Sequence, residues 1–337
     1  MKNRKVIIAL LDNLIWPLLI VTIIIFNFAS DKFLTTFNVT NILIHAAVLG
    51  ILTVGQSFTM ITGNFDLSAE SSLAITALIG AWLILPSGAP NFGGDVFLPV
   101  GLAIIALLMV GVIAGWINGF LITKLKMNNF IVTLAMLIVL RGLMLVISEG
   151  KTMTGLPDSF KALGHDNLGN IPISVLVMVI VFIIAHIIMQ YTQFGRNLYA
   201  VGGDPDAALA AGIDPEKRIR QVYLISGFLA ALGGLMLAGR TGVIVENMGS
   251  GMIFEIQAAA VIGGISLLGG RGTMVGAFGG VLLLSVIDSG LSLMRVSSFW
   301  IEVFSGLIIL VAMMIDAQKV RYSKIPSAKN ETSIKEI

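Results

Sequence analysis

The chain has 337 residues, of which 56% are hydrophobic and only 12% are Asp, Glu, Lys or Arg. Soluble globular proteins carry about 25% charged residues, so this chain has too few charges to cover the surface of a soluble domain. Its net charge of +2 provides no basic field for nucleic acid, and its lack of Cys excludes disulfide frameworks, thiolate catalysis and Cys-ligated metals. The composition predicts an all-α polytopic membrane protein.

Apolar stretches of membrane-spanning length recur along the whole chain. A transmembrane helix needs about 20 predominantly apolar residues. Ten stretches approach this length, at about 7–28, 42–61, 68–85, 98–122, 130–148, 173–190, 221–238, 254–268, 275–293 and 299–315. Turn-rich segments separate several of them, around 87–94 and from 155 to 172. The sequence therefore predicts about ten transmembrane helices.

Lys and Arg predict the orientation, because cytoplasmic loops of membrane proteins carry an excess of both. With the N-terminus inside, 15 of the 21 Lys and Arg fall in cytoplasmic segments and 5 in outer segments, while Arg141 lies within the fifth span. This bias predicts that both chain ends are cytoplasmic, together with the loops at 124–129, 192–220 and 316–337. Residues 1–320 would form one transmembrane domain, followed by a polar cytoplasmic tail at 321–337.

Small residues recur at every fourth position in three of the predicted spans. The three stripes are Gly111, Gly115 and Gly119; Ser226, Ala230, Gly234 and Ala238; and Gly272, Gly276 and Gly280. Small residues at this spacing let helix backbones approach closely in lipid. They predict either packing within the chain or contact with a second copy.

Two regions of the chain resemble each other. Asn118, in Trp116-Ile117-Asn118-Gly119, lies twelve residues before Phe130, and Asp288, in Val286-Ile287-Asp288-Ser289-Gly290, lies eleven residues before Phe299. A predicted span begins at each Phe, and the two copies would cross the membrane in opposite directions. This pattern indicates an inverted repeat, which is typical of transporters.

The longest predicted cytoplasmic loop, residues 192–220, contains the signals of a short helix. Asp204 can cap its N-terminus, Pro205 suits the first helical position, and Asp206 suits the positive end of the helix dipole. The residues that continue and then end it are Ala207, Ala208, Ala210, Ala211 and Gly212. Two interpretations follow: a plain connecting segment, or a compact knob that enters a groove on another protein.

The same loop carries a family motif. The run Asp206-Ala207-Ala208-x-x-x-Gly212 resembles the coupling-loop pattern Glu-Ala-Ala-x-x-x-Gly of ABC importer permeases, with Asp in place of Glu. The wider run, from Thr192-x-Phe194-Gly195-Arg196 through Ala200-Val201-Gly202-Gly203, is similar to the ribose/xylose/galactoside branch of that family. Further matches are Asn118-Gly119, Phe130-Ile131-Val132-Thr133-Leu134, Arg141-Gly142 and the run from Gly263 to Gly272. The resemblance covers roughly residues 40–315.

This resemblance implies a type II ABC importer-like permease in a bacterial plasma (inner) membrane. Two copies would pair, a separate cytoplasmic ABC ATPase would supply the energy, and an extracytoplasmic binding protein would deliver a monosaccharide or similar small polar solute. The chain itself would be no enzyme and would carry no cofactor or metal. The residues that would contact the ATPase are Gly195, Arg196, Gly203, Asp204, Asp206, Ala207, Ala208 and Gly212.

One turn departs from the family pattern. The family reads Gly-Gly-Ile-Asp-Leu-Ser and then Val-Gly-Ser, whereas this chain has Asn64, Phe65 and Glu70 around a retained Asp66-Leu67-Ser68. Asp66 and Ser68 fit an N-cap of the third span, or else they line the transport path. The full set of residues predicted to line the path is Asp66, Asn118, Phe130, Phe299 and Glu302.

Charged residues inside the predicted spans each need a reason, because a charge at the bilayer centre costs about 2.5–3.5 kcal/mol. For Arg141 we expect a carboxylate or carbonyl partner and no role in transport. Glu255, Asp288 and Glu302 lie toward outer span ends, which fits interfacial placement or a vestibule for a polar solute. Two alternatives to a sugar permease stay open: an ABC permease for a nucleoside or branched-chain amino acid, and an ion-coupled secondary transporter.

Overall fold

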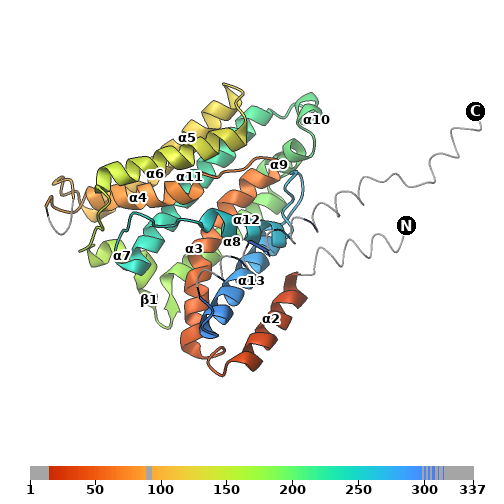
Figure 1. The fold of residues 1–337 in the computed structure, drawn as a ribbon. Coiled ribbons are helices and arrows are strands. Elements are labelled where there is room, and N and C mark those ends of the chain that lie inside the picture. Colours follow the sequence, from red (N-terminus) through yellow and green to blue (C-terminus); the bar gives the residue numbers. More distant parts are fainter. Residues whose placement is uncertain are drawn as a thin grey trace, which may run out of the picture.

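The computed structural model describes residues 15–88 and 93–297, together with the single positions 300, 303, 306, 307, 310 and 314. Helices make up most of this part of the chain and form one bundle, with a small hairpin beside it (Figure 1). In chain order the elements are α2 (Ile15–Ala29), α3 (Thr36–Ile61), α4 (Ala69–Trp82), α5 (Val100–Thr123), α6 (Asn129–Ser148), α7 (Asp158–His165), β1 (Asn167–Leu168), β2 (Ile171–Pro172), α8 (Ile173–Tyr191), α9 (Gln193–Gly203), α10 (Pro205–Ala210), α11 (Pro215–Thr241), α12 (Met252–Ile262) and α13 (Met274–Leu293).

Six of the described helices are long and apolar enough to cross a membrane, namely α3, α5, α6, α8, α11 and α13. The helices α2 and α12 are apolar but shorter, and α4 has 14 residues. Every predicted span that falls within the described residues coincides with a helix, although the span at 254–268 is reduced to α12. Most of the span at 299–315 lies outside the described residues. The fold is therefore that of a polytopic helical membrane protein, and the count of ten spans stays a prediction.

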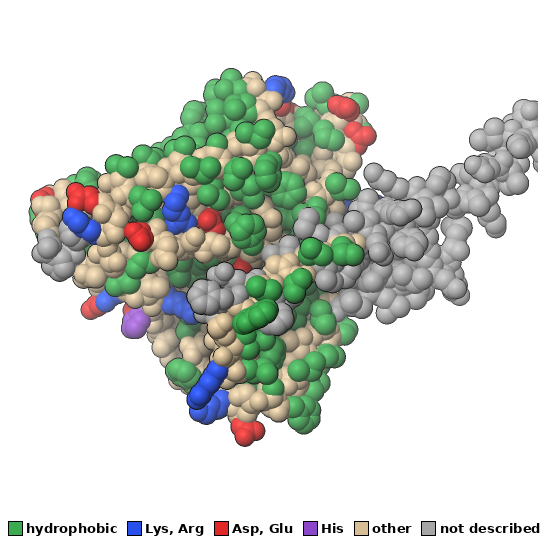
Figure 2. All heavy atoms as spheres, viewed as in Figure 1, with side chains coloured by type: hydrophobic (Ala, Val, Ile, Leu, Met, Phe, Trp, Pro, Cys, Tyr) green, Lys and Arg blue, Asp and Glu red, His purple; other side chains and the backbone are tan. Residues whose placement is uncertain are grey.

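Large apolar side chains cover much of the molecular surface. On α6, for example, Ile131, Ile138 and Val146 are 61%, 63% and 74% exposed. Figure 2 shows hydrophobic side chains spread widely over one face of the described bundle. A soluble domain rarely exposes so continuous an apolar surface, so this surface suits contact with lipid or with another membrane subunit.

Two stretches predicted mainly as loops contain more regular secondary structure than expected, which corrects the sequence analysis. Residues 155–172 contain α7 and the β1–β2 hairpin, in which Asn167 pairs with Pro172. Helix α7 is stabilised by contact with α11: a Cβ on Gly164 would lie only 2.1 Å from the Met236 carbonyl oxygen. An eight-residue helix held by such a distant contact gives almost no periodic signal of its own.

The predicted loop at 192–220 is the second such stretch. It contains α9 in addition to the expected short helix, and α11 begins at Pro215 instead of near 221. The Asp214 carboxylate accepts the N–H of Lys217 at 3.0 Å and caps α11. An Asp-Pro pair thus begins this helix as another begins the short helix before it, a signal that the sequence analysis used only once.

At the centre of the bundle, the two long helices α3 and α11 pack antiparallel. A Cβ on Gly55 would lie 3.3 Å from the Cα of Ser226, and one on Gly233 would lie 3.3 Å from the side chain of Leu52. Because residue numbers rise along α3 as they fall along α11, the helices run in opposite directions. Both are largely buried, with 61% and 72% of their most apolar windows inside the bundle.

The small-residue stripes make helix contacts inside the chain. A Cβ on Gly111 of α5 would lie 2.3 Å from the Gly227 carbonyl oxygen on α11, and one on Gly280 of α13 would lie 2.0 Å from the Ala259 carbonyl oxygen on α12. Backbones this close leave no room for larger side chains. Of the two interpretations of these stripes, packing within the chain is confirmed at these positions.

Helices in the two halves of the bundle pack in corresponding ways. Each half has a long helix (α3 or α11), then a short one (α4 or α12), then another long one (α5 or α13). The helices α4 and α5 contact α11, as α12 and α13 contact α3; α4 also contacts α5, as α12 contacts α13. In each half, therefore, the short helix and the second long helix pack against the first long helix of the other half.

Candidate functional site

The segment with the coupling-loop motif forms a helical corner where α9 meets α10, at one end of the bundle (Figure 1). The Asp204 carboxylate caps α10 by accepting the N–H groups of Asp206 and Ala207, both at 3.0 Å. Gly212 ends the turn after α10 with a φ of +81°, a conformation that favours glycine. The predicted N-cap and glycine turn are confirmed.

Helix α10 presents small side chains and one larger apolar side chain to the surroundings. Asp206, Ala207 and Ala210 are exposed, and Leu209 is 60% exposed. Ala208, which we expected at the contact with the ATPase, is instead 4% exposed and faces the bundle. The outer surface of α10 therefore consists mainly of alanine around Leu209, a shape that suits a shallow apolar groove.

The other residues expected at this contact differ in how far they are buried. Arg196, Gly203 and Asp204 are exposed, like Gly212. Gly195 is buried, and a Cβ there would lie 2.3 Å from the Met189 carbonyl oxygen. The sharp turn from α8 into α9 is thus sufficient to require glycine at position 195.

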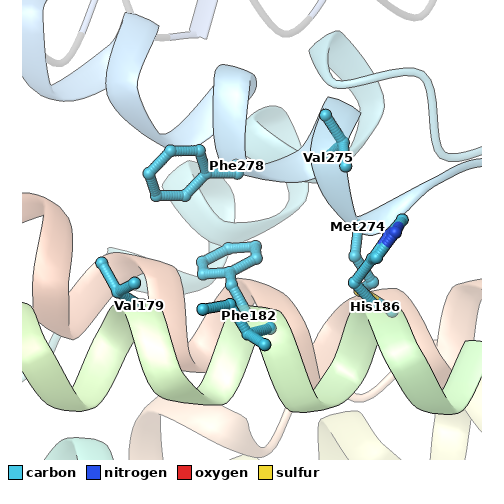
Figure 3. Close-up of a pocket in the computed structure, with 7 residues that line it drawn as sticks. Val179, Phe182, His186, Met274, Val275 and Phe278 are labelled. Carbon is cyan, nitrogen blue, oxygen red and sulfur yellow. The ribbon is translucent and has the colours of Figure 1, made fainter.

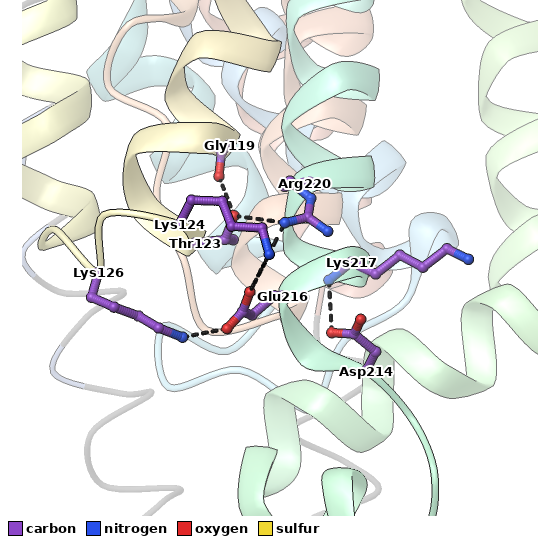
Figure 4. Close-up of polar contacts among 8 residues, drawn as sticks. All are labelled: Gly119, Thr123, Lys124, Lys126, Asp214, Glu216, Lys217 and Arg220. Carbon is purple, nitrogen blue, oxygen red and sulfur yellow. Dashed lines mark hydrogen bonds and ion pairs between the residues drawn. The ribbon is translucent and has the colours of Figure 1, made fainter.

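A cluster of charged residues joins the start of α11 to the α5–α6 connection (Figure 4). The Glu216 carboxylate lies 3.5 Å from the Lys124 ammonium and 3.9 Å from the Arg220 guanidinium, and it also contacts Lys126. The Arg220 guanidinium donates to the Thr123 hydroxyl at 3.4 Å. Residues from two of the three loops that were predicted to be cytoplasmic, 124–129 and 192–220, therefore meet at one end of the bundle. The sequence analysis did not identify Glu216, although its spacing of four residues from Arg220 was a usable signal.

Asp66 lies at the centre of a buried polar cluster that joins three helices. Its carboxylate accepts hydrogen bonds from the Ser68 hydroxyl (2.6 Å), the Ser68 N–H (3.1 Å) and the Ser226 hydroxyl on α11 (2.6 Å). The Asn118 amide of α5 donates to the Ser68 hydroxyl at 2.8 Å. The Ser68 side chain makes no capping hydrogen bond to α4. The principal role of Asp66 in this conformation is thus to hold the α3–α4 turn against α11.

The five residues predicted to line the transport path do not form one surface. Asp66 and Asn118 are brought together but are only 2% and 1% exposed. Phe130, at the start of α6, is 52% exposed and lies outside that cluster's hydrogen bonds. Phe299 and Glu302 lie outside the described residues.

Arg141 and Glu70 form an ion pair inside the bundle, with 3.5 Å between guanidinium nitrogen and carboxylate oxygen. Arg141 also donates to the carbonyl oxygens of Met248 (2.8 Å) and Glu246 (3.3 Å). The expectation of carboxylate and carbonyl partners for Arg141 is confirmed. Glu70 in turn accepts the N–H of Ile253 at 3.1 Å and so holds the N-terminus of α12. From the sequence, Glu70 was a departure from the family pattern and an acidic residue in the first turn of the third span, where the structure places it at the start of α4; its partners were not predicted.

An apolar cleft of ≈ 230 Å³ opens between α8 and α13 (Figure 3). Its walls are Val179, Phe182, Ile183, His186, Met274, Val275 and Phe278. Among these lining side chains, His186 alone carries an N–H or ring nitrogen for a hydrogen bond to a solute. The cleft therefore suits a hydrocarbon better than a polyol. Among the described residues, no group of three or more His, Cys, Asp or Glu could hold a metal ion.

The comparison with known proteins decides the family. The family model described as "Branched-chain amino acid transport system / permease component" matches residues 38–313, which include the coupling motif. The chain belongs to this permease family. Together with the similar permeases described next, this match confirms the resemblance to ABC importer permeases of the ribose and galactoside branch.

Three of the similar permeases differ in the solute that their names give. The chain is 38% identical to the ribose import permease protein of Bacillus subtilis, over 89% of this chain and 91% of the relative. It is 30% identical to the galactose/methyl galactoside import permease protein of Escherichia coli, over 96% and 99%. It is 35% identical to the autoinducer 2 import system permease protein of Photorhabdus luminescens, over 87% and 86%. No solved structure matches the chain.

Proposed function

We propose that this chain is the permease subunit of an ATP-driven importer, and that it translocates a monosaccharide or similar small polar solute. The observation that carries the proposal is the exposed, capped helix α10, which bears the family's coupling motif. The names of the similar permeases, which import ribose, galactosides and autoinducer 2, support the class of solute.

In this proposal α10 enters a groove on a separate cytoplasmic ATPase. Asp206 and Gly212 shape the knob, Leu209 fills the groove, and Arg196, Gly203 and Asp204 surround it. Closure of the ATPase on nucleotide would then displace α10 together with its neighbours. Two copies of the chain pair in the bilayer, and a binding protein delivers the solute from the other side of the membrane.

We further propose ten transmembrane segments in two inverted halves. The packing of α4 and α5 on α11, which corresponds to that of α12 and α13 on α3, supports this arrangement. The antiparallel course of α3 and α11 supports it as well, because inverted halves must cross the membrane in opposite directions. Both chain ends and the α10 corner would be cytoplasmic.

For the transport path we propose that Phe130 contacts solute directly, whereas Asp66 and Asn118 position the turn beside it. The side-chain amide of Asn129, next to Phe130, donates to the side-chain amide oxygen of Asn64 in that turn at 2.9 Å. This contact supports a path that passes the start of α6. Phe299 and Glu302 remain candidates for the path from their sequence positions alone.

Transport by the reconstituted complex tests the proposal. Proteoliposomes would hold this chain with its ATPase facing the lumen, and the binding protein and radiolabelled ribose or galactose would be added outside. We expect uptake only when ATP is enclosed, with none when a non-hydrolysable analogue replaces it. Uptake driven by a proton gradient without ATP would instead identify a secondary transporter.

A substrate series separates sugar from amino acid as the solute. Radiolabelled ribose, galactose, adenosine and leucine would each be supplied in turn in the same assay. We expect ATP-dependent uptake of a sugar and none of leucine. ATP-dependent uptake of leucine alone would contradict the sugar assignment while leaving the ATP-driven permease intact.

A further inference from the structure

Three segments far apart in sequence meet, without side chains between them, close to α10. They are the end of α3 (61–63), the end of α9 (202–203) and the α12–α13 connection (269–272). A Cβ on Gly202 would lie 1.8 Å from the Ile61 carbonyl oxygen and 2.6 Å from the Gly270 nitrogen. We call this contact of three backbones the glycine junction.

Hydrogen bonds hold the glycine junction together. The Gly270 N–H donates to the Ile61 carbonyl oxygen at 2.8 Å, which satisfies a carbonyl at the end of α3 that α3 itself leaves free. The Tyr199 hydroxyl of α9 donates to the Gly272 carbonyl oxygen at 2.8 Å. Gly269 and Gly270 have φ of +83° and +71°, which let the connection wrap closely around the end of α3.

The glycine junction lies between the coupling motif and the Asp66 turn. On one side, Asp204 alone separates α9 from α10. On the other side, Ile61 leads directly into residues 62–68, which carry Asp66. Close-packed backbones have little space in which to slide, so a displacement of α9 must displace the end of α3 as well.

We propose that the glycine junction transmits the motion of α9 and α10 to the end of α3, and from there to the Asp66 turn and the α12–α13 connection. The covalent chain links α10 directly only to α9 and α11, and through α9 to α8. The glycine junction adds α3, α12 and α13, so that both halves of the bundle respond to one docking helix. Gly202, Gly270 and Tyr199 are its positioning residues. This inference rests on the proposed function, because it requires an ATPase that moves α10.

Two helical glycines provide a matched test. A Cβ on Gly202 would collide with backbone, whereas one on Gly101 of α5 would meet nothing within 4 Å. We expect Gly101→Ala to behave as the natural chain. We expect Gly202→Ala to assemble with the ATPase and hydrolyse ATP, while uptake per ATP falls about 2- to 30-fold, the range for residues that lie between coupled sites.

A second variant keeps the test decisive if Gly202→Ala fails to fold. Tyr199→Phe removes only the hydroxyl that donates to the Gly272 carbonyl oxygen. This variant should reduce uptake per ATP without loss of assembly.

Each outcome has one meaning. Reduced uptake per ATP in Tyr199→Phe, with Gly101→Ala unchanged, supports the inference. Normal uptake per ATP in Tyr199→Phe, and in Gly202→Ala if that variant folds, would overturn it, provided that the natural chain transports. Absence of ATP-driven uptake by the natural chain would instead remove the proposed function.

Discussion

The Asp66 carboxylate and the Ser226 hydroxyl are 2.6 Å apart although 160 residues separate them in the chain. Their hydrogen bond joins the turn between α3 and α4 to the middle of α11. The Tyr223 hydroxyl, one turn earlier on α11, donates to the Phe65 carbonyl oxygen at 2.7 Å. Helix α11 therefore holds both the backbone and the side chain of this turn.

Removal of the Asp66 carboxylate should destabilise the protein. Asp66→Ala leaves the hydroxyls of Ser68 and Ser226 without their buried acceptor, at a cost of about 1–3 kcal/mol per unsatisfied group. We expect a lower melting temperature for the purified chain in detergent, followed by tryptophan fluorescence. Ser226→Ala, which leaves two of the three hydrogen bonds to Asp66, should show a smaller decrease. Equal melting temperatures for all three chains would contradict this role.

Glu70 and Arg141 should act as a pair. Glu70→Gln or Arg141→Met alone leaves a charged group inside the bundle without its partner, whereas the double variant removes both charges. We expect the two losses in unfolding free energy to be non-additive, with a coupling energy of about 0.5–3 kcal/mol. The measurement is a double-mutant cycle of thermal unfolding, and strictly additive losses would show that the pair contributes nothing.

Two glycines on α5 should differ sharply in their tolerance of alanine. A Cβ at Gly111 would lie 2.3 Å from the Gly227 carbonyl oxygen, whereas one at Gly101 would have no neighbour within 4 Å. Gly111→Ala must separate α5 from α11 and lower the melting temperature. Gly101→Ala should be neutral or stabilising, by up to about 1 kcal/mol from helix propensity. A melting temperature for Gly111→Ala as high as that of Gly101→Ala would contradict the close packing of these helices.

Gly212→Val should disturb the helical corner formed by α9, α10 and the turn at Gly212. A β-branched residue at φ +81° is strained by about 1–3 kcal/mol, so α10 would be displaced. We expect loss of the ATPase on purification, or ATP hydrolysis without uptake. Gly212→Asn is the control, because Asn tolerates the left-handed conformation and should retain transport. Asp206→Ala should be milder, since a charge at a helix N-terminus contributes about 0.3–1 kcal/mol. Normal co-purification and uptake in Gly212→Val would remove α10 from the coupling mechanism.

Cysteine labelling tests the orientation. In this Cys-free chain, Leu209→Cys on α10 and Lys124→Cys after α5 should resist a membrane-impermeant thiol reagent in intact cells. Both should react in inverted membrane vesicles. Lys32→Cys, in the exposed turn before α3, should show the opposite pattern. Reaction of Leu209→Cys from outside intact cells would reverse the proposed topology.

Features with local signals were predictable from the sequence. Long apolar runs predicted the helices that cross most of the bundle, because a helix satisfies its own backbone hydrogen bonds in lipid. The short helix α10 was predictable because its signals are local. Asp204 caps it, Pro205 begins it and Gly212 ends the turn after it, all within a few residues of one another. The family motif lies in the same run, so the sequence by itself determined the class of the protein and the position of the short helix that we propose as its docking element.

Features that depend on distant contacts were decided by the tertiary structure alone. The stripe at Gly111 fitted either a partner copy or the same chain until its contact with Gly227 chose between them. Glu70 could not be paired with Arg141 and Ile253 in advance, because no local pattern reports a neighbour more than 70 residues away. From the sequence, Asp66 could cap a helix or line the transport path. Only the packing of Ser226 against it shows that its carboxylate holds the α3–α4 turn to α11. Each of these outcomes depends on which helix faces come together, and packing of the whole bundle determines that.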